Sequence, residues 1–213
     1  MLFIESIFTF INMTENKTRM LVAEAHDLLS KYTVGKFLRY HSLGTGIAMS
    51  RLAVKLGQDV VLWECTGLVH DLDMELIDGD LSKHGVKTVE TLKSEGYDIP
   101  QMFDAIYAHT EVLAHSTFRR NELLDFILTG TENLVGFISA YVAVRPSRSI
   151  IGAEPKSIVK KMKDKSFSNA VNRDVIEDAI SHSKIERSEY IYEIIDALSE
   201  RASEVGLLQY SPS

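Results

Sequence analysis

Apolar residues recur at helical spacing along most of the chain, and no tract stands out with the alternation of a half-buried strand. Asp59 and Ser82 can cap the helices that follow them, and the second of these caps places His84 in a first helical turn. Thr129-Gly130-Thr131 divides two apolar helical runs. The pattern predicts helices over about 17–32, 37–56, 60–70, 82–94, 100–109, 121–128, 132–144, 173–181 and 187–205. The sequence therefore predicts an all-α fold.

The composition agrees with a folded domain. The chain has 213 residues, 45% of them hydrophobic, which suffices for a substantial core in one domain. Its formal charge of −7 argues against broad binding to duplex nucleic acid and suits a cytoplasmic protein. The single cysteine, Cys65, lies in an apolar run and excludes an intramolecular disulfide. We interpret Cys65 as a core residue in preference to a reactive thiol.

The first residues, 1–12, are apolar but too short to span a membrane, and they lack the basic start of a signal sequence. Met13 opens a polar segment, so this prefix can be a start-site extension whose apolar side packs on the body or on a partner subunit. A homodimer is one such arrangement. A basic stretch at 145–165 reads either as a solvated amphipathic helix or as a surface that faces phosphate.

Four histidines suggest a metal site. His70 and Asp71 are adjacent at the end of the apolar helix 60–70. Because neighbouring side chains on a helix diverge by about 100°, the pair can reach one ion only from a helix end or with the ion lying between them. His41 shares a helix face with small residues, and His84 and His109 fall near helix ends. Imidazole and carboxylate ligands suit divalent ions such as Zn, Mn, Fe, Co or Ni. The alternative is a helical scaffold with incidental histidines.

The ordered histidines, the His70-Asp71 pair and a distant carboxylate resemble the HD superfamily of metal-dependent phosphohydrolases. Four short sequence segments are similar to those of small, stand-alone HDIG-type members of this superfamily: Gly67–Glu75, His84-Gly85, Ala105–His109 and Val144–Ser147. The resemblance implies a single-domain HD-type helical bundle with extra C-terminal helices. We expect an N-terminal extension at 1–16, an HD metal-binding core at 17–145 and a C-terminal extension at 146–213 packed on that core.

The resemblance also implies a ligand set. His41, His70 and Asp71 would bind a first metal, while His84 and His109 would bind a second that Asp71 bridges. The family's last ligand is an aspartate, and this chain has Glu132 at that position. Asp125, seven residues earlier on nearly the same helix face, is a rival that the sequence leaves open. One or two divalent ions (Fe, Mn, Ni, Co, Zn or Mg) are the expected cofactors.

The expected reaction is hydrolysis of a phosphate ester by metal-activated water. Asp71 would hold the ions, and Asp73 is a candidate for a supporting partner or a general base, or else a surface acid. Arg145 and Arg148 follow the Glu132 helix and could neutralise a substrate phosphate. The substrate would be a nucleotide or another small phosphorylated molecule, with no membrane involved. The competing interpretation is an HD-fold regulatory module that binds metal or nucleotide without catalysis, which the glutamate at 132 favours.

Overall fold

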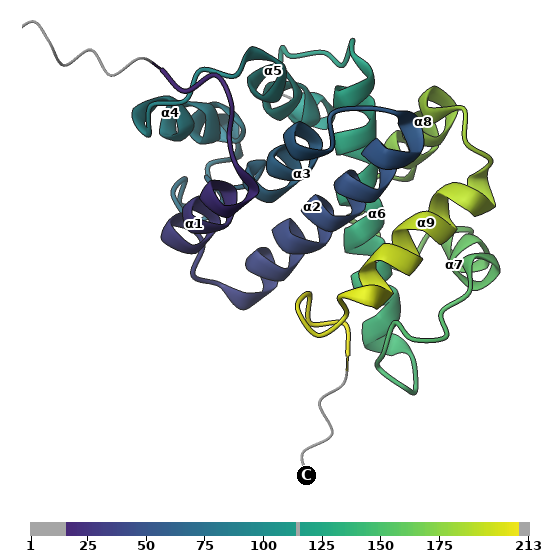
Figure 1. Cartoon of the computed structure of the whole chain (residues 1–213). Coiled ribbons are helices and arrows are strands. Elements are labelled where there is room, and N and C mark those ends of the chain that lie inside the picture. Colours follow the sequence, from purple (N-terminus) through teal and green to yellow (C-terminus); the bar gives the residue numbers. More distant parts are fainter. Residues whose placement is uncertain (1–15, 114–115, 209–213) are drawn as a thin grey trace, which may run out of the picture.

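The computed structural model describes residues 16–113 and 116–208, and these residues form helices joined by short loops (Figure 1). These described residues form no β-strand, and their β-type pairing is limited to an isolated bridge between Lys17 and Tyr97. The all-α class is therefore confirmed. The elements are α1 (Val22–Tyr32), α2 (Lys36–Leu56), α3 (Val60–Val69), η1 (Leu81–Lys83), α4 (Val86–Ser94), α5 (Pro100–Ala108), η2 (His109–Val112), α6 (Leu123–Val144), α7 (Pro155–Met162), α8 (Arg173–Ser183) and α9 (Arg187–Glu200).

The expected N-terminal extension lies outside the described residues except for Asn16. Helix α1 begins at Val22, later than the pattern predicts, and α9 ends at Glu200 instead of near Val205. Both differences fall at helix ends, where local patterning is least informative. Cys65 is buried, and burial raises the pKa of its thiol to about 12. The interpretation of Cys65 as a core residue is confirmed.

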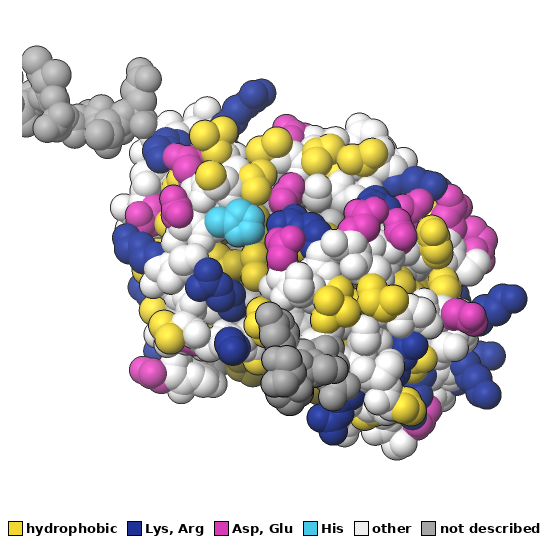
Figure 2. Space-filling model, turned by 60° about the horizontal axis from the view of Figure 1, so that its bottom comes forward, with side chains coloured by type: hydrophobic (Ala, Val, Ile, Leu, Met, Phe, Trp, Pro, Cys, Tyr) yellow, Lys and Arg dark blue, Asp and Glu magenta, His cyan; other side chains and the backbone are white. Residues whose placement is uncertain are grey.

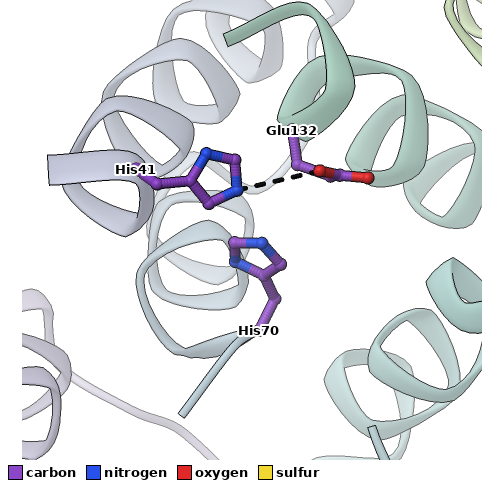
Figure 3. A group of neighbouring side chains, drawn as sticks. All are labelled: His41, His70 and Glu132. Carbon is purple, nitrogen blue, oxygen red and sulfur yellow. Dashed lines mark ion pairs between the residues drawn. The ribbon is translucent and has the colours of Figure 1, made fainter. Parts of the chain in front are cut away.

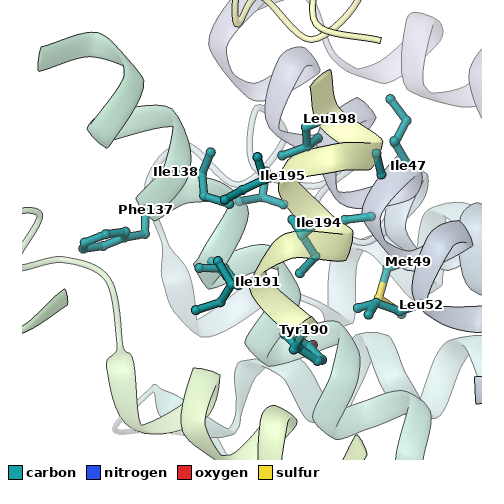
Figure 4. Packing of buried hydrophobic residues seen from close by; sticks show 14 of the residues in the cluster. Ile47, Met49, Leu52, Phe137, Ile138, Tyr190, Ile191, Ile194, Ile195 and Leu198 are labelled. Carbon is teal, nitrogen blue, oxygen red and sulfur yellow. The ribbon is translucent and has the colours of Figure 1, made fainter. Parts of the chain in front are cut away.

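Helix α6 is the central element, with α2, α5 and α8 packed around it (Figure 1). By length and composition α6 could cross a membrane, but 61% of its most apolar window is buried inside the fold. Helix α9 closes this core from the C-terminal side and packs on α2 and α7. Figure 4 shows Ile191, Ile194 and Ile195 of α9 inserted among side chains of α2 and α6. A second apolar cluster joins α1, α3, α4 and α5.

Two glycines bring α2 and α3 into direct backbone contact. A Cβ atom on Gly67 of α3 would lie 2.9 Å from the Cα and N atoms of Gly46 on α2. Only glycine at both positions allows this approach, which the larger Cβ-bearing residues would prevent. The contact matters for the site, because His41 lies on α2 and His70 follows α3 directly.

The predicted break at Gly130 is wrong, since α6 runs without interruption from Leu123 to Val144. A Cβ atom on Gly130 would lie 2.2 Å from the Cβ atom of Ala179 on α8. The glycine therefore serves the packing of α8 against α6. The Thr129 hydroxyl donates to the carbonyl of Asp125, so this polar side chain is satisfied inside the helix.

The predicted helix 82–94 starts too early, because α4 begins at Val86. His84 has extended backbone geometry, and Gly85 follows it with φ of 76°. The Asp73 carboxylate accepts hydrogen bonds from the backbone N–H groups of Gly85 and Thr88, at 2.6 and 3.2 Å. A distant aspartate thus caps α4, and His84 is left in the loop before it.

The surface mixes charges of both signs. On the face drawn in Figure 2, acidic and basic side chains are interspersed with apolar patches. Arg51 of α2 pairs with Asp196 and Glu200 of α9 at 2.8 and 2.7 Å. These exposed pairs tie the C-terminal helix to α2, and each contributes little on its own.

Candidate metal centre

His70 lies where the apolar helix α3 ends, and its side chain is completely buried. Its Nδ1 atom is 2.9 Å from the carbonyl oxygen of Gly67, which accepts the ring N–H. This contact fixes the tautomer and leaves the lone pair of Nε2 directed into the interior. The Nε2 atom has no hydrogen-bond partner within the described residues. A buried polar atom without a partner is costly, and a bound cation would satisfy it.

A first ligand group consists of His41, His70 and Glu132, whose ligand atoms lie within 4.8 Å of one another. Figure 3 shows the three side chains pointing toward one another from α2, the end of α3 and α6. The Nε2 atom of His41 is 3.7 Å from a carboxylate oxygen of Glu132. Three segments far apart in the chain therefore deliver ligands to one point.

A second ligand group consists of Asp71, His84 and His109, again with ligand atoms within 4.8 Å. The Nε2 atoms of His84 and His109 each lie 3.6 Å from the Oδ1 atom of Asp71. They lie 3.0 Å from each other. The Nδ1 atom of His109 hydrogen-bonds the carbonyl of Ile106, so this ring is oriented in the same way as His70.

Asp71 faces both groups. Its Oδ2 atom lies 3.4 Å from Nε2 of His70 and 3.7 Å from Nε2 of His41. Its Oδ1 atom faces His84 and His109. One carboxylate thus presents a separate oxygen to each group, which is the arrangement of a bridging ligand between two cations.

Electrostatics keep His41, His70 and Asp71 in the form that a cation needs, but they oppose ionisation of Glu132. Burial lowers the pKa of His41 to about 4 and also lowers the pKa of His70. Burial acts against ionisation of Asp71, but the histidines around it hold its pKa well below the usual value. Burial and the Asp71 charge raise the pKa of Glu132 well above its usual value. Neutral imidazoles beside clustered carboxylates fit a divalent cation.

The position of Asp73 defines its contribution. Its side chain is completely buried, and its Oδ1 atom lies 2.9 Å from Nδ1 of His84. The other oxygen accepts from the α4 backbone. It is therefore not a surface acid, and with both oxygens engaged it is not placed as a general base. Asp73 orients His84 so that Nε2 of that ring faces His109 and Asp71.

The structure separates Glu132 from its rival. The Oδ2 atom of Asp125 accepts from the backbone N–H groups of Asn121 and Glu122 at 3.0 Å each, so this carboxylate caps the start of α6. Asp125 belongs to neither ligand group, whereas Glu132 belongs to the first. Asp125 and Glu132, seven residues apart, lie on nearly the same face of α6, but only Glu132 is close to His41.

Arg145 and Arg148 have different surroundings. The guanidinium of Arg145 donates to the carbonyls of Ser149, Ile150 and Gly152 and so clamps the loop after α6. These bonds engage Nη1 and Nη2 of Arg145, so they compete with the predicted role of Arg145 in phosphate binding, which stays a prediction. Arg148 is exposed and lines a cavity that His41 also borders. Within the described residues its guanidinium has no recorded hydrogen bond or ion pair.

Asn133 is a site neighbour that sequence reasoning missed. Its amide contacts the Glu132 carboxylate and donates to the carbonyl of Thr129 at 3.0 Å. Its Oδ1 atom accepts from the backbone of Asn172 at 2.9 Å. Asn133 therefore links the Glu132 side chain to the start of α8. An asparagine beside a carboxylate inside an apolar helix is the available sequence signal.

Comparison with known families agrees with this geometry. Residues 38–134 match the model of the HD domain, and the matched segment contains His41, His70, Asp71, His84, His109 and Glu132. Residues 38–134 are therefore identified as an HD domain, a family whose members are generally metal-dependent hydrolases. No curated protein matches the chain significantly, and no solved structure does.

Proposed function

We propose that the protein is a metal-dependent phosphohydrolase that cleaves a phosphate ester bond of a nucleotide or another small phosphorylated substrate. One arrangement in the site carries the proposal. The buried Nε2 atom of His70 has no hydrogen-bond partner among the described residues, and the Asp71 carboxylate beside it faces histidines of both ligand groups. A structural core gains nothing from such an arrangement, because these polar groups are largely desolvated.

His41, His70, Asp71 and Glu132 would hold one ion, and Asp71, His84 and His109 would hold a second. When bound, divalent ions lower the pKa of water toward neutrality and offset the charge of phosphoryl oxygens. The imidazole-rich set favours Fe, Mn, Co, Ni or Zn over Mg. We propose a cytoplasmic protein with a small phosphorylated substrate, and we leave a homodimer as a prediction.

The other residues of the site support this chemistry. Asp73 fixes the ring of His84, and the carbonyls of Gly67 and Ile106 fix the rings of His70 and His109. Preset rings avoid reorganisation when a ligand enters. Arg148, whose guanidinium has no hydrogen-bond or ion-pair partner in the part of the chain that the structure describes, is the cation that we assign to an anionic substrate.

A regulatory module without catalysis is the second candidate. The Glu132 carboxylate is engaged by Asn133, and its pKa is raised well above the usual value. Both features weaken Glu132 as a metal ligand relative to an unengaged, ionised carboxylate. Under this alternative the protein would bind metal or nucleotide and turn nothing over.

The decisive experiment is elemental analysis of protein purified without chelator or affinity metal. We expect one or two equivalents of a transition metal in the wild type and none in Asp71→Ala, with unchanged helical circular dichroism. Asp27→Ala, at an exposed position of α1, is the matched control and should keep its metal. Absence of metal from the wild type after reconstitution would refute the proposal. Metal without hydrolysis of any phosphate ester would favour the regulatory module.

A further inference from the structure

A cavity of about 350 Å³ adjoins the first ligand group at His41, and neither His84 nor His109 lines it. His41, whose side chain is 14% exposed, forms part of its wall. Helices α2 and α6 and the C-terminal segment 205–208 enclose it. Its lining is formed by Phe37, Tyr40, His41, Gly136, Ser139, Val142, Ala143, Arg148 and residues 205–208. The cavity is therefore mainly apolar, with aromatic side chains near the metal ligands and one cation.

Gly136 is the unusual member of this lining. Of the 12 glycines in the chain, six have positive φ values, and five others would place a Cβ atom 3.0 Å or less from another residue. Gly136 has neither property, because among the described residues no atom beyond its chain neighbours and its own helix backbone lies within 4 Å of the position its Cβ would occupy. A glycine inside a helix costs about 1 kcal/mol relative to alanine. Neither backbone conformation nor packing accounts for glycine at this position.

The position of Gly136 relates the open space to the site. It lies four residues after Glu132 on α6, and Phe37 lies four residues before His41 on α2. Residues four apart share a helix face, so the cavity begins one turn beyond the ligands on both helices. A molecule held at the metal ligands by one end can extend over Gly136 between these two faces.

A second cavity of about 260 Å³ borders Asp71, His84, His109 and Glu132. The charged and imidazole groups in its lining are those of the candidate metal centre. We therefore assign this second cavity to the ions and to the phosphoryl group of the substrate. The larger, apolar cavity over Gly136 is left for the part of a substrate that carries no phosphate.

Building on the proposed function, we infer that the cavity over Gly136 binds the organic group of the substrate. The group is a single flat, largely apolar unit, such as an aromatic ring or one nucleobase with its sugar. Tyr40 and Phe37 offer aromatic surface, and the volume lies at the lower end of the range for small-ligand pockets. The substrate class is therefore a phosphomonoester with one such group, and a cyclic dinucleotide is too large.

The test compares two phosphonates that cannot be hydrolysed, phenylphosphonate and methylphosphonate, by calorimetric titration of manganese-loaded protein. They share the anionic group and differ in the apolar unit. We expect the wild type to bind phenylphosphonate at least about tenfold more tightly, as burial of an aromatic ring supports. Gly136→Leu should abolish this preference and leave the affinity for methylphosphonate within about twofold. Ala23→Leu, which adds bulk to the exposed face of α1, should keep it.

The outcomes separate the two proposals. Equal affinities of the wild type for both phosphonates, or a preference that survives Gly136→Leu, would refute the subsite and leave the proposed function standing. Binding of neither phosphonate to the metal-loaded wild type would refute the proposed function itself. If circular dichroism shows that Gly136→Leu is unfolded, Gly136→Ala gives the same comparison, since its methyl group enters open space and should reduce the preference partly.

Discussion

The contact between Gly67 and Gly46 predicts a mutation that damages the metal centre from outside it. In Gly67→Ala the new Cβ atom would lie 2.9 Å from the α2 backbone, whereas ordinary van der Waals contact begins at 3.4 Å. Helices α2 and α3 must therefore separate by about 0.5 Å (3.4 minus 2.9). Since metal–ligand distances tolerate about 0.2 Å, His41 would move out of register with His70.

The magnitude combines two opposing effects. Overpacking costs about 1–3 kcal/mol, and the better helix propensity of alanine returns about 1 kcal/mol. We expect a net loss on the order of 1–2 kcal/mol in the free energy of unfolding of the metal-free protein, together with a metal affinity lower by about 10–100-fold. Urea denaturation followed by circular dichroism measures the first effect. Competition with a metal-sensitive dye measures the second.

Gly136→Ala is the matched control, because its Cβ atom meets nothing within 4 Å. It should gain up to about 1 kcal/mol of stability and keep the wild-type metal affinity. If Gly67→Ala bound metal as tightly as the wild type, the close approach of α2 and α3 would not position the ligands, and the reasoning would fail.

Three further predictions concern charged groups. Glu132→Gln should stabilise the metal-free protein by an amount that grows as pH rises above 4.5, because a raised folded-state pKa means that ionisation of Glu132 favours the unfolded state. Denaturation of the variant and the wild type at several pH values measures this. A difference in unfolding free energy that stays constant with pH would contradict it. Asp73→Asn should lower the affinity of the second metal by about 10–100-fold, seen as a reduced stoichiometry, with little change for the first. Arg148→Ala should weaken binding of both phosphonates by a few-fold in a salt-dependent manner, because its charge attracts the anion from the wall of the neighbouring cavity, while Arg145→Ala should act through stability alone.

Much of the fold was within reach of the sequence because helix ends carry local signals. Asp59 caps α3 by accepting from the N–H of Leu62, and Gly57 ends α2 with φ of 66°. The errors at Gly130 and at the start of α4 have a common cause, which is contact between distant segments. Gly130 reads as a helix break until Ala179 of α8 is placed against it.

The same reasoning applies to the site. The identity of its histidines was predictable, because His70-Asp71 ends an apolar helix and the family resemblance orders the others. The choice between Glu132 and Asp125 was not, since both lie on nearly the same face of α6. Only the three-dimensional structure reveals that one carboxylate caps the helix and the other faces His41. The role of Asp73 in orienting His84 was not predictable either, because it rests on a contact between residues 11 positions apart in the sequence.

The ligands come from segments between residues 41 and 132, so an ion held by them would act as a cross-link across most of the HD domain. Asp71, which faces both ligand groups, would make occupancy of one ion position depend on the other. Folding and metal uptake then become linked equilibria, and free metal at 100 times its dissociation constant adds about 2.7 kcal/mol to stability. The cellular abundance of such a protein would follow the supply of its metal.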